Sequence, residues 1–312
     1  MTSKSALVSS CKAMLSICGL VSCLLGQAPP SQQGFETPQA AADALIHAAE
    51  VYDVAALKAI LGPDSDDVIA SADPVADKNR GAAFAAKARE RKSVRVDPLQ
   101  PKTATLSVGG EDWPLPIPIV LRRGKWYFDT KSGREELLRR RIGANELDAM
   151  TICRGFVDAQ IQYAMDRHGN SGPNQYAQRI ISAPGKQDGL YWQNDDGTSG
   201  GPISKAVARA IEEGYSPSKS SPFHGYHFKI LKGQGPSAQL GRLDFVINGA
   251  MIGGFALVAA PAEYRVTGVK TFIVSHQGVV YQKDLGTDSL KIFQKMDRFD
   301  PDKTWRRTDD GW

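Results

Sequence analysis

The chain has 312 residues, of which 42% are hydrophobic and 23% are charged. This is the balance of a globular protein with room for two domains of ordinary size, and it excludes an intrinsically disordered chain. A formal net charge of only +4 excludes the strong basic footprint that nucleic-acid binding requires.

The first 22 residues are predicted to be a signal peptide. Lys4 and Lys12 precede an uncharged run over residues 13–26, which is too short to cross a bilayer as a helix but suits the apolar core of a secretory signal. The run LVSC, which ends at Cys23, resembles the lipobox of bacterial lipoproteins, whose cysteine thiol receives a lipid. We therefore expect export to the periplasm or outer membrane, lipid attachment at Cys23, and a flexible tether over residues 23–35.

Two other fates of this segment stay open. Gly26-Gln27-Ala28 offers a small-residue site for ordinary signal peptidase, which would give a secreted protein, although Pro29 directly after it constrains the backbone that must lie extended in the protease. An uncleaved anchor is the third alternative. Three of the four cysteines lie within the first 23 residues, so Cys153 alone remains in the folded body and no intramolecular disulfide is expected there.

Residues 36–130 are predicted to form a domain of helices plus a curved antiparallel sheet. Thr37 and Pro38 supply a capping hydroxyl and a proline at the first helical position, Asp53 caps a second short helix, and a third helix runs from about Pro74 to Arg91. Alternating apolar residues then predict short strands in the runs SVRV, TATLSV, PIPIVLRR and KWYFDT. This order of elements resembles the cone-shaped fold of nuclear transport factor two-like domains.

Residues 131–221 are predicted to be a helical connector with a long loop. Apolar residues at helical spacing indicate one helix that ends at Gly143 and a second that restarts at Asn145 and continues to about Arg167, with Cys153 on its buried stripe. The basic run at residues 139–141 follows two glutamates, and we interpret it as a solvated helix face. Residues 166–202 have the composition of a loop, and a short helix follows Pro202.

Residues 222–312 are predicted to form an antiparallel β-meander domain, which makes the whole chain an α+β protein. Alternation on both sides of His276-Gln277-Gly278 predicts a hairpin. The blocks GYHFKIL, FALVAAP and TFIVSHQGVVY resemble the β-meander head of pilin-like secreted proteins. The usual N-terminal pilin helix is missing, so this likeness supports only an antiparallel sheet.

The run GTSGGP at residues 197–202 resembles the nucleophile loop of chymotrypsin-like proteases, but its surroundings argue against that chemistry. The mechanism needs a histidine base that is oriented by a buried carboxylate. The histidines before it are His47, inside a predicted helix, and His168, in a polar loop. A helix rather than a barrel strand follows Pro202, so we predict that Ser199 lies in a turn and is not a nucleophile.

Other reactive motifs are also missing. The sequence has no phosphate loop, no dinucleotide fingerprint and no G-x-S-x-G elbow. His224 and His227 would point to opposite faces of a strand, and the C-terminal aspartates lack the glycine-centred spacing of a calcium loop. We expect no metal, no cofactor and no catalytic residue that the sequence alone can name.

Two aromatic segments suit a contact surface. The first segment, GKQDGLYWQ, and the second, HGYHF, place aromatic and charged residues close together. The alternative is that the aromatic residues anchor a long loop on the body. The candidate binding residues are Lys186, Asp188, Tyr191, Trp192, His224 and Tyr226.

Several blocks in order, among them DAQIQYA, GKQDGLYW, PFHGYHFKIL, MIGGFALVAAPAEY and TFIVSHQGVVYQKDLG, resemble a secreted bacterial family known as domain of unknown function twenty-nine fifty. The resemblance covers about residues 35 to 305 and implies an exported envelope protein of unassigned activity. We expect a non-catalytic protein that binds an envelope protein or a small ligand and touches the membrane only through its lipid. The alternative is an envelope hydrolase with a site between the two domains that uses His224, Asp188 or Lys186.

Overall fold

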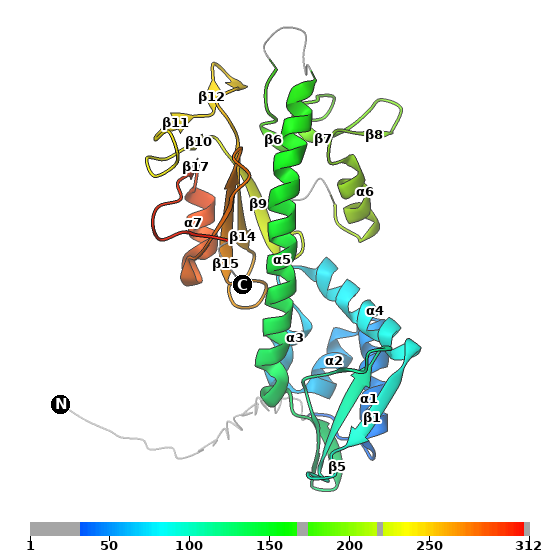
Figure 1. Cartoon of the computed structure of the whole chain (residues 1–312). Coiled ribbons are helices and arrows are strands. Elements are labelled where there is room, and N and C mark those ends of the chain that lie inside the picture. Colours follow the sequence, from blue (N-terminus) through cyan, green and yellow to red (C-terminus); the bar gives the residue numbers. More distant parts are fainter. Residues whose placement is uncertain (1–31, 167–173, 217–220, 309–312) are drawn as a thin grey trace, which may run out of the picture.

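One long helix, α5 (Thr130–Met165), joins two separately packed hydrophobic cores. The computed structural model describes residues 32–166, 174–216 and 221–308. Figure 1 shows the N-terminal helices and sheet at one end of α5 and a second group of strands and short helices along its other half. The combination of helices with several antiparallel sheets confirms the predicted α+β class.

Three of the N-terminal helices begin where the sequence predicts, because a side chain at each of these starts satisfies a free backbone N–H. The helices are α1 (Pro38–Glu50), α2 (Val54–Leu61), the 3-10 turn η1 (Pro63–Ser65), α3 (Asp66–Ile69) and α4 (Pro74–Glu90). Thr37, Asp53 and Asp73 cap α1, α2 and α4, with N–H to oxygen distances of 3.1, 3.0 and 3.0 Å. Local chemistry thus decides these boundaries.

The N-terminal sheet follows the predicted alternation. Its strands are β1 (Lys92–Val96), β2 (Thr103–Val108), β3 (Trp113–Pro114), β4 (Ile119–Arg122) and β5 (Lys125–Phe128). They pair antiparallel in the order β1-β2-β4-β5, and β3 pairs with β2. Ala104, Leu106 and Val108 on β2 are buried while their neighbours are partly exposed, so one face of the sheet covers the N-terminal core.

The predicted break at Gly143 is wrong, since α5 continues through it as a single helix of 36 residues, about 54 Å long. One glycine costs an exposed helix only about 1 kcal/mol, and α5 is held on both sides of Gly143 by packing against the two cores. Cys153 lies on the buried stripe, as predicted, and burial raises the pKa of its thiol to about 12. The thiol therefore stays protonated and unreactive in the folded protein.

The C-terminal core forms around a five-stranded antiparallel sheet in the order β18-β16-β15-β14-β9. Its strands are β9 (Tyr226–Leu231), β14 (Ala256–Pro261), β15 (Lys270–Ser275), β16 (Val280–Asp284) and β18 (Arg306–Arg307). Figure 1 shows this sheet between α5 and α7 (Ser289–Lys295). All six residues of β14 are buried because helices cover both faces. The hairpin of β15 and β16 confirms the predicted turn, with Gly278 at a positive φ of 77°.

The segment predicted as a loop over residues 166–202 contains strands instead. These are β6 (Arg179–Ile181), β7 (Gly189–Gln193) and β8 (Ser199–Gly200), and α6 (Ser204–Glu212) follows as predicted. The polar and glycine-rich composition of this segment did not predict strands, because the three strands are short and β7 alone has a run of buried residues. The remaining elements are η2 (Gly286–Asp288), β10 (Gly233–Gln234), β11 (Leu243–Asp244), β12 (Val246–Ile247), β13 (Ala250–Met251) and β17 (Arg298–Phe299). Within the described residues, none of the helices is long and apolar enough to cross a bilayer.

Candidate functional site

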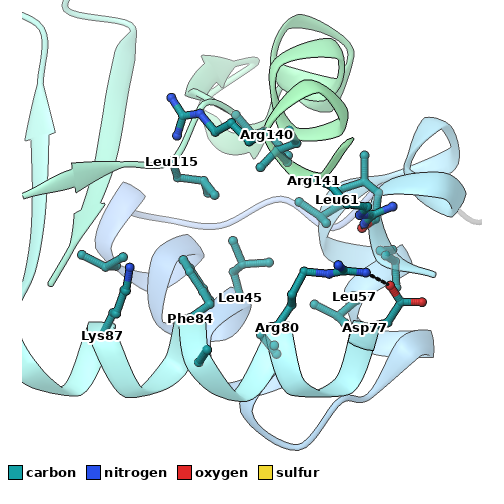
Figure 2. A pocket seen from close by; sticks show the side chains of 18 of the residues that line it. Leu45, Leu57, Leu61, Asp77, Arg80, Phe84, Lys87, Leu115, Arg140 and Arg141 are labelled. Atoms are coloured by element: carbon teal, nitrogen blue, oxygen red, sulfur yellow. Dashed lines mark hydrogen bonds and ion pairs between the residues drawn. The ribbon is translucent and has the colours of Figure 1, made fainter. Parts of the chain in front are cut away.

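A cavity of about 510 Å³ opens between α4 and α5 above the N-terminal sheet, and Figure 2 shows it from close by. This volume lies within the range of small-molecule sites in proteins. Most of its wall is apolar and comes from α1, α2, α4 and the sheet, including Leu45, Leu57, Phe84, Leu115 and Ile117. We call it the α4–α5 pocket.

The pocket exists because the two helices that face each other across it carry few large apolar side chains. Phe84 is the single large apolar residue that α4 contributes to the wall, and Leu137 is the single one from α5. Gly81 brings α4 against α1, since a Cβ there would lie 2.6 Å from the carbonyl oxygen of Ala49. Small residues at Ala83 and Ala144 leave the opening unfilled, and both are exposed.

Four cationic side chains and one carboxylate also line the α4–α5 pocket. Arg80 donates to the buried Asp77 carboxylate at 2.8 Å, and the amide N–H of Ser71 donates to the same carboxylate at 2.6 Å. Arg140 pairs with Glu136 at 2.7 Å, and its guanidinium carbon lies 4.8 Å from the centre of the Trp113 ring. The charges of Arg80 and Arg140 are therefore compensated within the protein.

Arg141 is held differently. It donates to the backbone carbonyls of Asp67, at 2.6 Å, and of Val68, and it forms no ion pair with any described carboxylate. Burial lowers the pKa of the Arg141 guanidinium, and the positive charge of Arg80 lowers it further. The protein thus keeps a partly desolvated cation in the wall of an apolar pocket without a direct ion pair to the described residues, although the charges of Asp77, Asp67 and Glu263 raise its pKa.

A second group of polar residues joins the two cores. Asp73, which is 1% exposed, accepts from the Tyr215 hydroxyl at 3.0 Å and from the Gly225 amide at 2.8 Å while it caps α4. Burial and the charge of Asp73 raise the pKa of Tyr215, so its hydroxyl stays protonated and donates. Asp73 is therefore a structural clasp between α4 and the C-terminal half, and both of its carboxylate oxygens accept hydrogen bonds.

His224 lies beside this clasp, in the turn before β9, with a positive φ of 49°. Its Nδ1 is 2.9 Å from the Asp148 carboxylate on α5, and its Nε2 is 3.1 Å from the Glu213 carboxylate after α6. The two carboxylates lie on opposite sides of the ring and do not converge on one point. Across the described residues no group of three His, Cys, Asp or Glu side chains is arranged to hold a metal. His224 connects three elements, and the prediction that His224 and His227 point to opposite faces of one strand does not apply, because only His227 is on β9.

Lys186 and Asp188 lie far from His224. Both line a polar cavity of about 630 Å³ that also includes Tyr163 and Arg179. Tyr163 lies roughly 22 Å along α5 from Asp148, the residue that contacts His224, so this cavity is remote from His224. The Asp188 carboxylate accepts from the Ala183 amide at 2.8 Å.

The aromatic candidates turn out to be anchors. Tyr226 is fully buried and its hydroxyl donates to the Lys270 carbonyl at 2.9 Å, whereas Tyr191 is 7% exposed on β7. Trp192 is partly buried, and its ring N–H donates to Asn194 at 3.1 Å. The six candidate residues do not form one exposed surface, because packing of the strands buries the two tyrosines. Ser199 faces the Tyr191 hydroxyl at 3.3 Å in a short strand, where we predicted a plain turn.

Sequence reasoning missed the α4–α5 pocket and treated the basic run at residues 139–141 as a solvated face. A signal was present: consecutive helical residues are rotated by about 100°, so three arginines in a row span about 200° and cannot all face solvent on a helix that packs. Arg139 is exposed, Arg140 rests on Trp113 and Arg141 turns into the pocket wall. The exposed charge and the pocket cation therefore come from one motif.

The fold and the pocket define an α+β protein with a cavity of about 510 Å³ next to a long connecting helix. The chain belongs to the family described as protein of unknown function (DUF2950), whose model matches residues 32–308. No curated protein and no solved structure matches the chain. The likenesses to nuclear transport factor two-like and pilin-like folds therefore stay predictions.

Proposed function

We propose that the protein is a non-catalytic binding protein that holds a small molecule with an apolar body in the α4–α5 pocket. One observation carries this proposal: a cavity of about 510 Å³ with leucine, isoleucine and phenylalanine walls, whose lining also includes the small, exposed residues Ala83 and Ala144. Burial of apolar ligand surface there is worth about 25 cal/mol per Å². Helices and strands of the folded core build the walls of the pocket, which favours binding because little has to be ordered.

The alternative, a hydrolase with a site between the two halves, has less support. Of the residues suggested for it, His224 is the one at the junction, and carboxylates engage both of its ring nitrogens. Asp188 and Lys186 line a different cavity. Binding therefore fits the described geometry better than acid–base chemistry, which needs a base aimed at a substrate.

We also propose that the protein is exported and lipid-anchored through Cys23, which lies outside the described residues. The support is the lipobox-like run that ends at this cysteine and the charge-free stretch before it. Cys23→Ser is expected to abolish metabolic labelling of the protein with palmitate, whereas Cys18→Ser, in the same segment, is expected to leave the label in place. Persistence of the label on Cys23→Ser would contradict the anchor.

The binding proposal is tested with N-phenyl-1-naphthylamine, an uncharged apolar dye that fluoresces in dry sites. The protein is expected to bind it, and Ala83→Trp and Ala144→Trp are each expected to weaken binding about tenfold or more, since an indole fills the opening without replacing a core residue. Ala82→Trp is the matched control, because Ala82 is exposed on the same helix but does not line the pocket. Equal affinity of all four proteins would refute the pocket as the site.

A further inference from the structure

We propose that the ligand of the α4–α5 pocket is an amphipathic anion, with one carboxylate-like group bound by Arg141 and its apolar body against the leucine-lined wall. This inference rests on the proposed function and adds the charge of the ligand to it. Three observations lead to it: the charge balance of the pocket, the surroundings of Arg141 and the position of Arg80.

The charge balance leaves two cations without a direct ion pair. Arg80 is paired with Asp77 and Arg140 with Glu136. Lys87 and Arg141 also line the pocket, and neither forms an ion pair with a described residue. An apolar cavity with two spare positive charges selects against a cationic ligand and in favour of an anionic one.

Of these two cations, Arg141 gains more from an anion. Lys87 is exposed, so water already solvates its ammonium group and a new ion pair there is worth little. Arg141 is partly desolvated, which its lowered pKa reflects. Two backbone carbonyls accept from Nη1 and Nη2, and a guanidinium has five N–H donors, so donors remain for a ligand oxygen.

Arg80 strengthens this assignment. After burial, the positive charge of Arg80 lowers the pKa of the Arg141 guanidinium, while the charges of Asp77, Asp67 and Glu263 raise it. Asp77 holds Arg80 at 2.8 Å, and a weaker contact of 3.4 Å reaches the side-chain oxygen of Asn145. Figure 2 shows Arg80 pointing along α4 toward Asp77, with Arg141 on the α5 side of the pocket. A carboxylate next to Arg141 would relieve both the desolvation and the repulsion, and its chain would extend over Leu57 and Leu61.

The test compares three ligands with the same twelve-carbon chain and different heads: dodecanoate, 1-dodecanol and dodecyltrimethylammonium. Each displaces N-phenyl-1-naphthylamine from the full-length protein at pH 8, where a carboxyl group is ionised, and below the concentration at which it forms micelles. Dodecanoate is expected to bind about tenfold or more tightly than dodecanol, because a charge-assisted hydrogen bond exceeds a neutral one by about that factor. The ammonium compound is expected to bind most weakly.

Variants locate the anion. Arg141→Gln is expected to reduce the preference for dodecanoate over dodecanol to within about twofold. Lys78→Gln is the matched control, since Lys78 is exposed on α4 and does not line the pocket, and it is expected to keep the full preference. Arg141→Lys keeps the charge without the planar donor pair and is expected to give an intermediate preference. If Arg141→Gln does not fold, the three ligands on the unmodified protein still decide the question.

The outcomes separate the two proposals. Equal affinity for the three heads, with dye binding still blocked by Ala83→Trp, would overturn the anionic ligand and leave the binding pocket standing. A preference for dodecanoate that Arg141→Gln leaves unchanged would also overturn the role of Arg141. Dye binding that Ala83→Trp does not affect would overturn the pocket itself.

Discussion

Asp73→Ala is expected to lower the free energy of unfolding by about 3 kcal/mol, since it removes a helix cap worth about 1 kcal/mol and leaves buried donors without an acceptor. The carboxylate accepts from Ala76 on α4, and from Tyr215 and Gly225 in the C-terminal half. Gly225 is buried, so its amide cannot turn to water instead. The loss should appear as a lower midpoint in urea denaturation followed by circular dichroism.

Two further variants divide this effect. Tyr215→Phe removes one of the donors while keeping the ring against Phe223, whose centre is 4.8 Å away, so a loss of about 1 kcal/mol is expected. Asp53→Ala is the matched cap control, because Asp53 caps α2 with an N–H to oxygen distance of 3.0 Å at an exposed site, and should also cost about 1 kcal/mol. If Asp73→Ala is no more destabilising than Asp53→Ala, Asp73 is a cap and not a clasp between the two halves.

Gly133→Ala is expected to destabilise the protein by about 2 kcal/mol or more, because an added methyl group would meet backbone and not a movable side chain. An ideal Cβ at Gly133 lies 2.4 Å from the carbonyl oxygen of Pro116 and 2.6 Å from the Cα of Ile117. The first turn of α5 would have to move away from the sheet. Thermal unfolding should show a clear fall in the midpoint temperature.

Gly143→Ala makes the opposite prediction on the same helix. No heavy atom lies within 4 Å of an added Cβ there, so the substitution should stabilise the protein by about 0.5–1 kcal/mol through helix propensity alone. Gly133→Ala and Gly143→Ala make the same chemical change at two positions of α5, and comparing their stabilities tests whether the helix is continuous. A loss of stability at Gly143 would mean that the helix is interrupted there after all.

The α4–α5 pocket and the contact between the two halves share residues. Arg80 lines the pocket and reaches Asn145, and the Asn145 side-chain amide donates to the Thr267 carbonyl at 2.8 Å in the C-terminal half. Asp77, the partner of Arg80, follows Asp73 by one helical turn on α4. The wall of the pocket therefore belongs to the same polar network that holds α4, α5 and the C-terminal half together.

The amino-acid sequence by itself determined the local elements. Thr37, Asp53 and Asp73 begin helices because a side-chain oxygen next to free backbone N–H groups acts over three residues. Alternation in β2 and the helical stripe through Cys153 likewise follow from neighbours a few positions away. The blocks that resemble the family are also local, and the family match over residues 32–308 confirms them.

Only the tertiary structure decided the site. The pocket needs α4 and α5 to face each other, although more than forty residues separate Phe84 from Leu137 in the sequence. No pattern in either helix predicts that the two helices are neighbours. The burial of Tyr226 and the two carboxylates beside His224 also depend on residues far away in the sequence. Short-range chemistry sets where helices and strands begin, whereas long-range packing sets which cations lie in a cavity and which aromatic rings lie in a core.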